Sequence, residues 1–516
     1  MIKKLLPYAK KYKLSAVLSP LLIVCEVLLE VTIPLLMSVI VDCGINGQAI
    51  SQKSSFVADI LIKLGFAAKT GTDLIIAVGA LMVFLACISL ACGAGAAFFA
   101  ARAGMGFGAE LRKGIFNKIQ DFSFSNVDKF STGALITRMT TDINMVQNTF
   151  MMALRMLIRS PLMFIMAISM AFGINKKLSF VFMCIAPVMF ALILIIGSAA
   201  HKRFTAMFKK YDKFNNFIQE NLIAARVVKA FVRAKHEKDK FKVSNDELKD
   251  ASIFAEKLII LNGPIMSVSI YTCIILILWV GSGLILNGDM QLGDLMSFIT
   301  YIQQIFMSLM IISMIFVLSV MAKASMGRIC EVLDEESHIK DCAEDSSLTV
   351  QDGSIEFKNV SFKYSKGAKK DVLKNINLHI SSGETIGIIG GTGSAKSSLV
   401  QLIPRLYDVT EGEVLVGGRN VKDYTMHNLR ESVSMVLQTN LLFSGTIEEN
   451  LRWGNENATI EEIRAAAKIA QADDFVMSFA DGYKTDLGQG GVNVSGGQKQ
   501  RLCIARAILK KPKVLI

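Results

Sequence analysis

Charged residues are scarce in this chain. Only 19% of its 516 residues are charged, whereas 52% are hydrophobic. A soluble globular protein carries about 25% charged residues, so the composition excludes a single water-soluble domain. The apolar excess lies in residues 14–322, and from about residue 351 the sequence is typical of a mixed soluble domain. We therefore expect one part of the chain in lipid and another in water.

Regularly spaced cysteine pairs are also missing. The nine cysteines are scattered, and none belongs to a Cys-x-x-Cys pair. This pattern indicates neither a disulfide framework nor a zinc site, so we interpret the cysteines as packing thiols. The net charge of +12 comes from lysines and arginines in the loops between apolar stretches. Basic loops orient membrane proteins, so we expect no nucleic-acid partner.

Six apolar stretches dominate the first part. They cover residues 14–41, 74–101, 150–175, 178–200, 258–287 and 295–322. Each has the roughly 20 residues that a helix needs to cross the hydrocarbon core. The positive-inside rule places the N-terminus and the basic inner segments in the cytoplasm. We predict an all-α, multi-pass domain in the cell membrane, with lipid around it.

The inner segments 102–149 and 201–257 are rich in helix-forming residues. We expect them to continue the spans as helical stalks into the cytoplasm. Residues 124–135 and 211–222 are the predicted turning points. The domains that follow are a transmembrane domain at 1–325, a linker at 326–350 and a soluble domain at 351–516.

Two pairs of charged residues lie inside the predicted spans. Glu26 and Glu30 are four residues apart and share a helix face, as do Arg155 and Arg159. Charges inside a membrane usually face the bundle interior or a wet cavity. One interpretation is a polar face for cationic cargo at Glu26 and Glu30. The alternatives are mutual pairing, or pairing with Gln303 and Gln304.

The soluble domain contains a glycine-rich turn that is typical of a phosphate-binding site. The segment ETIGIIG, residues 384–390, reads as a buried strand, and KSSLVQLIPRLY begins a helix at Lys396. Glycines in the turn between them would let the backbone wrap phosphates, with Lys396 reaching the β and γ oxygens and Ser397 reaching Mg²⁺. Ala395 stands where a phosphate loop has glycine. A left-handed backbone there would cost about 1–2 kcal/mol, and a right-handed one little.

A second turn follows about a hundred residues later. Ser495, Gly496, Gly497 and Gln498 begin a basic, alanine-rich helix, whose start also suits an anion. One chain does not easily bring both turns onto one nucleotide. Two such domains arranged head to tail do, with each ATP between the first turn of one chain and the second turn of the other.

The whole chain resembles an ATP-binding cassette (ABC) exporter half-transporter. The resemblance implies an α/β P-loop ATPase domain after the six spans. It assigns adenine stacking to Tyr364 and contact with Mg²⁺ and the attacking water to Gln438. It assigns the signature motif to residues 495–498, with Val494 in place of the usual leucine. It assigns ATP binding to Gly391, Thr392, Gly393, Ser394, Ala395, Lys396, Ser397 and Ser398.

The resemblance further implies ATP-driven export of small, amphipathic or drug-like molecules by a dimer. Details such as SGGQKQRL are similar to bacterial heterodimeric multidrug half-transporters, so we expect a second half-transporter as partner, in a heterodimer rather than a homodimer. Two alternatives stay open. The chain is a regulatory subunit with a catalytically weak site, or it is a lipid flippase.

The last residues, KPKVLI, resemble the start of the strand that leads to the Walker B aspartate and the catalytic glutamate. Neither carboxylate follows within residue 516, and all five histidines precede the signature, so the switch histidine is also absent. We therefore expect the nucleotide-binding domain to be truncated at its C-terminus, with the full-length protein acting as an ABC-type ATPase.

Overall fold

A computed structural model describes the chain except for residues 51–52, 54–55, 67–68, 342–346 and 365–369. The chain divides into two compact units. The helical unit comprises Met1–Asn117 and Ile136–Asp334, and the mixed unit comprises Lys118–Leu135 and Glu335–Ile516. A short segment between two membrane helices thus belongs with the C-terminal part of the chain.

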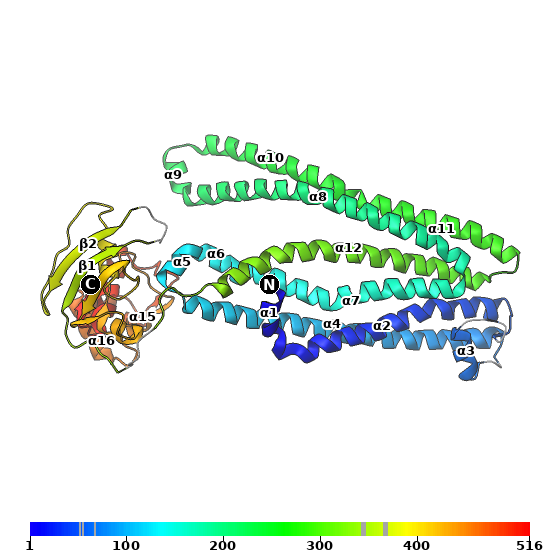
Figure 1. Ribbon diagram of the computed structural model, residues 1–516, viewed down its shortest axis with the longest axis horizontal. Coiled ribbons are helices and arrows are strands. Elements are labelled where there is room, and N and C mark those ends of the chain that lie inside the picture. Colours follow the sequence, from blue (N-terminus) through cyan, green and yellow to red (C-terminus); the bar gives the residue numbers. More distant parts are fainter. Residues whose placement is uncertain (51–52, 54–55, 67–68, 342–346, 365–369) are drawn as a thin grey trace. The chain divides into compact units, whose positions relative to one another are not determined.

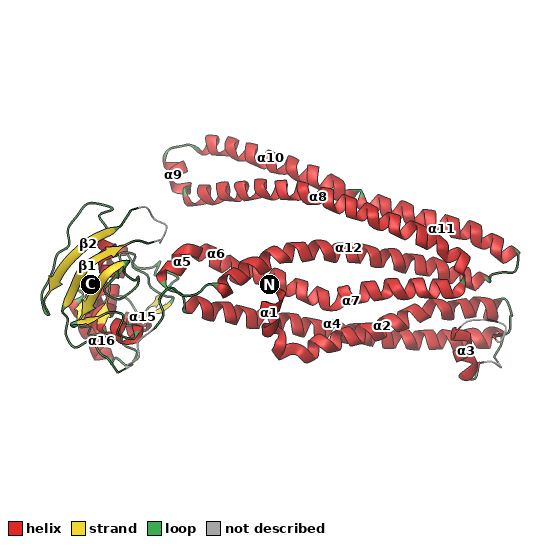
Figure 2. Ribbon diagram, viewed as in Figure 1, coloured by secondary structure: helices red, strands yellow, loops and turns green. Residues whose placement is uncertain are grey.

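Long helices build the helical unit (Figures 1 and 2). In lipid, every backbone polar group needs a partner within its own segment, which favours uninterrupted helices. The helices are α1 Ile2–Ala9, α2 Lys13–Val39, α3 Phe56–Lys63, α4 Gly71–Gln120, α7 Ile143–Ile174, α8 Lys176–Ile223, α9 Ala225–Ala230, α10 Ala234–Ile260, α11 Asn262–Leu286 and α12 Leu292–Asp334. A 3₁₀ turn, Lys10–Tyr12, and π-helical turns at Ile40–Ile45 and Arg138–Asp142 adjoin them.

Five of these helical segments, among the residues that the structure describes, are long and apolar enough to cross a membrane. They are Ile2–Ile45, Gly71–Gln120, Thr132–Ile174, Ala234–Leu286 and Leu292–Ile315. Each overlaps one predicted span. The remaining predicted span, residues 178–200, lies in α8, where several side chains are outside the described residues.

The core of the helical unit forms where α2, α7 and α12 pack together. The Tyr301 hydroxyl of α12 donates a hydrogen bond to the Val31 carbonyl of α2 at 2.8 Å, and the Ser297 hydroxyl donates to the Pro34 carbonyl at 2.6 Å. Both side chains are buried, so these bonds satisfy polar groups that would otherwise be costly in an apolar interior.

A buried ion cluster joins the far ends of α2 and α12. Lys53 pairs with Asp42, and its ammonium lies 3.2 Å from a carboxylate oxygen of Asp294. Asp42 also accepts a hydrogen bond from the Gly293 amide at 2.7 Å. Lys53 and Asp42 are buried and Asp294 is partly exposed, so removing Lys53 or Asp42 would leave a buried charge without its partner.

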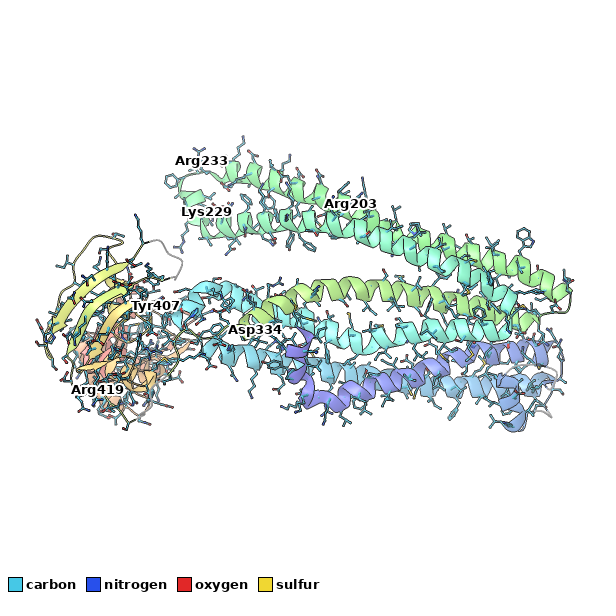
Figure 3. The ribbon with its side chains drawn as sticks, in the orientation of Figure 1. Arg203, Lys229, Arg233, Asp334, Tyr407 and Arg419 are labelled. Carbon is cyan, nitrogen blue, oxygen red and sulfur yellow. The ribbon has the colours of Figure 1, made fainter. Side chains whose placement is uncertain are left out.

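Helices α8 and α10 form a hairpin that ends at α9 (Figure 1). Its two arms are tied by the Lys210–Glu247 ion pair and by Arg203, whose guanidinium lies over the Phe254 ring. Figure 3 labels Arg203 on its arm of the hairpin. The predicted turn at residues 211–222 is wrong, because α8 continues to Ile223 and the chain reverses at residues 224–233. The earlier turn is confirmed, since α4 ends at Gln120 and α5, Phe124–Phe130, follows.

The mixed unit is built on a four-stranded antiparallel sheet with the order β2-β1-β3-β4. Two further pairs are the parallel β5 and β8 and the antiparallel β6 and β7. The strands are β1 Ile355–Phe362, β2 Leu373–Ile380, β3 Glu411–Val416, β4 Arg419–Asn420, β5 Val433–Ser434, β6 Gly445–Thr446, β7 Asp486–Leu487 and β8 Val514–Leu515.

Helices surround two separate cores in the mixed unit. One core lies against the sheet and includes Phe357, Val414 and Tyr407. The other lies mainly among helices, together with β7 and adjoining loops, and includes Leu451, Ile463 and Leu502. The helices are α5, α6 Thr132–Thr137, α13 Lys396–Gln401, α14 Met426–Ser432, α15 Ile447–Arg452, α16 Ile460–Ile469, α17 Asp473–Met477 and α18 Gly496–Leu509, with a 3₁₀ turn at Gly482–Lys484.

Candidate nucleotide site

The segment before the glycine-rich turn is not the predicted buried strand. Residues 384–390 have no strand structure and are exposed, and Ile389 is 98% exposed. A strand needs a neighbour to share its backbone hydrogen bonds. Among the described residues, no strand pairs with this segment. The strand that the apolar sequence predicts for residues 384–390 is therefore wrong.

The Ser394 side chain folds over Gly390. A Cβ on Gly390 would lie 2.6 Å from the Ser394 hydroxyl oxygen, so any other residue here would require the Ser394 side chain to shift. Gly393 has a positive φ of 83°. Ala395 has φ 62° and ψ 23°, which is a left-handed backbone conformation. Of the two conformations considered from the sequence, this is the one with the conformational cost of about 1–2 kcal/mol.

Lys396 folds back into the turn. Its ammonium donates to the Gly390 carbonyl at 2.8 Å, to the Gly391 carbonyl at 2.9 Å and to the Ser394 hydroxyl at 3.3 Å. A cation that is held only by neutral groups lacks a counter-charge. An anion at this turn would supply it, so the side chains present fit a phosphate group.

Tyr364 belongs to an aromatic cluster beside the turn. Its ring meets Phe362 edge-on at 4.8 Å and Tyr407 edge-on at 5.1 Å between ring centroids. Its hydroxyl lies 2.7 Å from the hydroxyl of Ser398, which is buried. The side chain nevertheless remains 48% exposed, as a ring that stacks on a base requires.

The remaining predicted residues of the turn face solvent. Gly391, Thr392, Ser394 and Ser397 are exposed, and so is Gln438. Among the described residues, no group of three or more His, Cys, Asp or Glu side chains is placed to hold a metal ion. A magnesium ion bound through hydroxyl, amide and phosphate oxygens would not require such a group.

A capping box forms at the second turn that the sequence predicts to bind an anion. The Ser495 hydroxyl accepts from the Gln498 amide at 3.3 Å, and the Ser495 amide donates to the Gln498 side chain at 2.8 Å. This arrangement satisfies backbone groups at the start of α18 and leaves Ser495, Gly496 and Gly497 exposed. Within the same helix, the Lys499 ammonium donates to the Gly490 carbonyl at 2.8 Å.

Glu26 and Glu30 have a partner in the helical unit. The Arg159 guanidinium lies 2.7 Å from the Glu30 carboxylate and 3.5 Å from that of Glu26. Two carboxylates share one guanidinium, so the cluster retains a net negative charge when all three groups are ionised. The side chains remain partly accessible, with exposed fractions of 17% for Glu26 and 34% for Glu30.

Two residues near the nucleotide turn were missed by the sequence analysis. Tyr407 is buried beside Tyr364, and its hydroxyl donates to the Asp128 carboxylate at 2.7 Å. Asp128 lies in the segment predicted as a turning point, so the sequence predicts its position in a cytoplasmic loop. The sequence around Asp128 does not predict its contact with Tyr407, which is 279 positions away.

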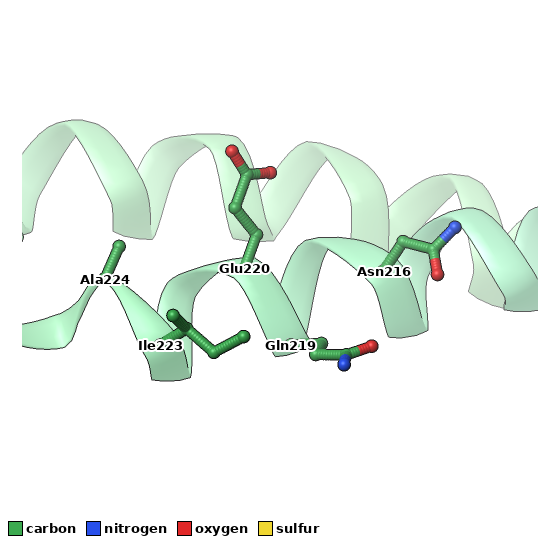
Figure 4. Close-up of a pocket in the computed structure, with 5 residues that line it drawn as sticks. All are labelled: Asn216, Gln219, Glu220, Ile223 and Ala224. Carbon is green, nitrogen blue, oxygen red and sulfur yellow. The ribbon is translucent and has the colours of Figure 1, made fainter. Parts of the chain in front are cut away.

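A shallow hollow of about 380 Å³ lies on α8 (Figure 4). It is lined by Asn216, Gln219, Glu220, Ile223 and Ala224. All five residues come from the end of one helix and its following turn. None of the predicted nucleotide or cargo residues contributes to the hollow.

Comparisons with known proteins agree on a family. Residues 17–309 match the model of the ABC transporter transmembrane region, and residues 373–516 match the ABC transporter model. The chain is 37% identical over 516 residues to the uncharacterised ABC transporter ATP-binding protein YfiB of Bacillus subtilis, covering all of this chain and 86% of that protein.

Two further relatives are similar over shorter spans. The uncharacterised ABC transporter ATP-binding protein Mb1304c of Mycobacterium bovis is 35% identical over 457 residues, which is 87% of this chain and 77% of that protein. The ATP-dependent lipid A-core flippase of Desulfotalea psychrophila is 32% identical over 415 residues, which is 80% of this chain and 72% of that protein.

Proposed function

The chain belongs to the ABC transporter family, with a transmembrane region and an ATP-binding domain fused in one polypeptide, and from this premise we propose that it is one half of a dimeric exporter. ATP binds between two chains, held by residues 390–398 of one and residues 495–498 of the other. Closure of the two ATP-binding domains then switches the spans from inward-facing to outward-facing. Reversing a 1:99 population requires about 5.5 kcal/mol of differential binding, which two nucleotides supply.

One observation carries this proposal. A single compact unit contains both anion-binding turns and also α5, a helix that the chain inserts between α4 and α7 of the helical unit. Nucleotide binding and the connection to the membrane helices therefore belong to one body. This is the arrangement that a transporter powered by domain closure requires.

The residues of the turn divide the work of holding ATP. Lys396 exchanges its carbonyl partners for β and γ oxygens, and Tyr364 stacks on adenine. Ser397 and Gln438 would hold Mg²⁺, and the bound ion would offset negative charge on the phosphate oxygens. We assign no proton-transfer role to the residues of this chain.

The hairpin tip supports a partner chain. Phe231 and Val232, just after α9, are 73% and 87% exposed, and the basic residues Lys229 and Arg233 flank them in the sequence. Figure 3 labels Lys229 and Arg233. Large exposed apolar residues in a cytoplasmic loop mark a surface that another protein covers. We assign this tip to contact with the second half-transporter, for which a heterodimer is our preferred assembly.

The Glu26–Glu30–Arg159 cluster supports a cationic, amphipathic cargo. Its surplus negative charge lies on helices of the membrane-spanning core and is partly accessible. A cation favours such a site because an unpaired carboxylate is costly in an apolar surrounding. Lipid is the alternative cargo, and the flippase among the relatives favours it.

A regulatory subunit is the second candidate function. The left-handed Ala395 favours it, because backbone strain at a phosphate loop weakens a site that must also bind nucleotide. In that case the partner chain hydrolyses ATP while this chain only binds it.

The experiment uses the natural protein, purified with its partner half-transporter and reconstituted in lipid vesicles. ATP hydrolysis and uptake of a fluorescent lipophilic cation are measured for the wild type, for Lys396→Ala and for Lys422→Ala, an exposed lysine of the same unit. We expect Lys396→Ala to lose both activities by about tenfold or more and Lys422→Ala to retain them. Full activity in Lys396→Ala would contradict catalysis at this site and favour the regulatory function.

The same vesicles test the cargo. Glu26→Gln removes one charge and leaves the shorter Glu30–Arg159 pair in place, so the helical unit should remain folded. We expect uptake of the lipophilic cation to fall while transfer of a zwitterionic fluorescent lipid is unchanged. Equal uptake of the cation by the variant and the wild type would contradict the cargo assignment.

A further inference from the structure

A continuous set of contacts joins α5 to the phosphate-binding turn within the mixed unit. The Asp128 carboxylate of α5 accepts from the Tyr407 hydroxyl at 2.7 Å. The Tyr407 ring meets Tyr364 at an interplanar angle of 89°. The Tyr364 hydroxyl then lies 2.7 Å from the hydroxyl of Ser398, in the helix α13 that directly follows the turn.

Tyr407 is suited to hold its neighbours in place. It is buried, and its ring also packs against Phe362 and Phe124. Burial, together with the hydrogen bond to Asp128, raises the pKa of the Tyr407 hydroxyl. The hydroxyl is therefore protonated at neutral pH and acts as the donor to the carboxylate. Figure 3 labels Tyr407 in the mixed unit.

Other contacts besides the one between Asp128 and Tyr407 hold α5 in the mixed unit. The Asn126 side chain donates to the Glu335 carboxylate and to the Glu336 carbonyl, both at 2.9 Å. Lys129 forms an ion pair with Glu335 at 2.7 Å. These contacts hold α5 against residues 335–336. We therefore expect α5 to stay in place when the contact between Asp128 and Tyr407 is removed.

We propose that Tyr407 positions the Tyr364 ring for the nucleotide base, and that its hydroxyl links this position to α5 through Asp128. The proposal rests on the nucleotide site of the proposed function. Two edge-on ring contacts and the Ser398 hydroxyl set the plane of Tyr364 and leave part of the ring exposed for stacking. A displacement of α5 then changes the affinity for the base, and binding of the base displaces α5 in return.

The test compares ATP with inorganic tripolyphosphate, which has the phosphates but no base. Equilibrium binding of both is measured on the natural, assembled transporter at low temperature. The variants are Tyr407→Leu, Tyr407→Phe, Asp128→Asn and the double variant Tyr407→Phe/Asp128→Asn. Lys129→Gln is the matched control, because it removes the neighbouring ion pair of the same helix and leaves the aromatic cluster intact.

We expect Tyr407→Leu to weaken ATP binding by about three- to tenfold, the range of a lost aromatic contact, and to leave tripolyphosphate binding unchanged. Tyr407→Phe and Asp128→Asn should each weaken ATP binding by about two- to threefold, and the double variant by no more than either single one. Asp128 is exposed, so water can hydrate its carboxylate when Tyr407→Phe removes the tyrosine hydroxyl. We therefore expect Tyr407→Phe to fold normally.

Three results would overturn the proposal. They are an equal loss of ATP and tripolyphosphate binding in Tyr407→Leu, an additive loss in the double variant, and a loss in Lys129→Gln as large as that in Asp128→Asn. A wild-type protein that binds neither ligand would instead refute the proposed function itself. Failure of the two proposals is therefore distinguishable.

Discussion

Ala395 is the residue at which this phosphate loop departs most clearly from the usual pattern. Its left-handed backbone is a conformation that residues with a Cβ rarely adopt. The neighbouring Lys396 contacts three oxygens of the same loop, so the loop closes on itself and keeps Ala395 in this conformation. The strain is consequently a property of the folded loop and should be removable at a single position.

Ala395→Gly should stabilise the mixed unit. Glycine relieves the left-handed strain but has more backbone entropy to lose on folding, so we expect a net gain of about 0.5–1 kcal/mol in the free energy of unfolding. Gly393→Ala is the opposite change at a residue with φ 83° and should destabilise by a similar amount. Chemical denaturation of the natural protein and both variants measures this. A loss of stability in Ala395→Gly would show that the loop is not strained.

The first residues of helix α18 cap the helix and are also proposed to contact ATP. Its capping box has the same hydrogen bonds as that of α16, where Thr459 and Glu462 take the places of Ser495 and Gln498. The α16 box is part of no assigned nucleotide contact. The two helices therefore separate the effect of a cap on stability from its effect on ATP.

Ser495→Ala and Thr459→Ala should each reduce the stability of the mixed unit by about 1 kcal/mol, because each removes one N-cap hydroxyl. Only Ser495→Ala should also reduce ATP hydrolysis in the assembled transporter. Thermal unfolding and hydrolysis rates of both variants provide the comparison. If Thr459→Ala lost hydrolysis to the same degree, the effect would be one of folding and the role of Ser495 in binding ATP would be refuted.

Elements were predictable from the sequence where their cause is local. Uninterrupted apolar stretches predicted the long helices, and closely spaced glycines predicted the turn at residues 390–393. The strand at residues 384–390 was predicted wrongly because a strand depends on a neighbour that its own sequence does not specify. The turn at 211–222 was misplaced because polar, helix-forming residues suit either the end of a hairpin arm or its turn.

Contacts between distant residues were not predictable in the same way. Arg159 lies 129 positions from Glu30, and its pairing with that residue follows from how α2 and α7 pack. Tyr407 and Asp128 meet only because α5 belongs to the mixed unit. The backbone conformation of Ala395 was also not predictable from the residue type, because its φ is set by the whole loop.

The proposed transporter requires a second chain to complete each nucleotide site. The signature turn and the phosphate loop belong to one unit, but each is assigned to a different nucleotide in the assembled transporter. The exposed apolar tip of the α8–α10 hairpin is likewise proposed to contact that second chain. ATP-driven export requires that assembly. The decisive property is therefore whether residues 495–498 of one chain lie next to the glycine-rich turn of the other.

The most direct measurement places a photocrosslinking amino acid at Val492, which is 78% exposed and lies three residues before Ser495. The assembled transporter is irradiated with ATP, with ADP and without nucleotide, and the crosslinked peptides are identified by mass spectrometry. We predict a crosslink to the glycine-rich phosphate loop of a second chain that is strongest with ATP. Crosslinks confined to the same chain, or unaffected by ATP, would contradict the account.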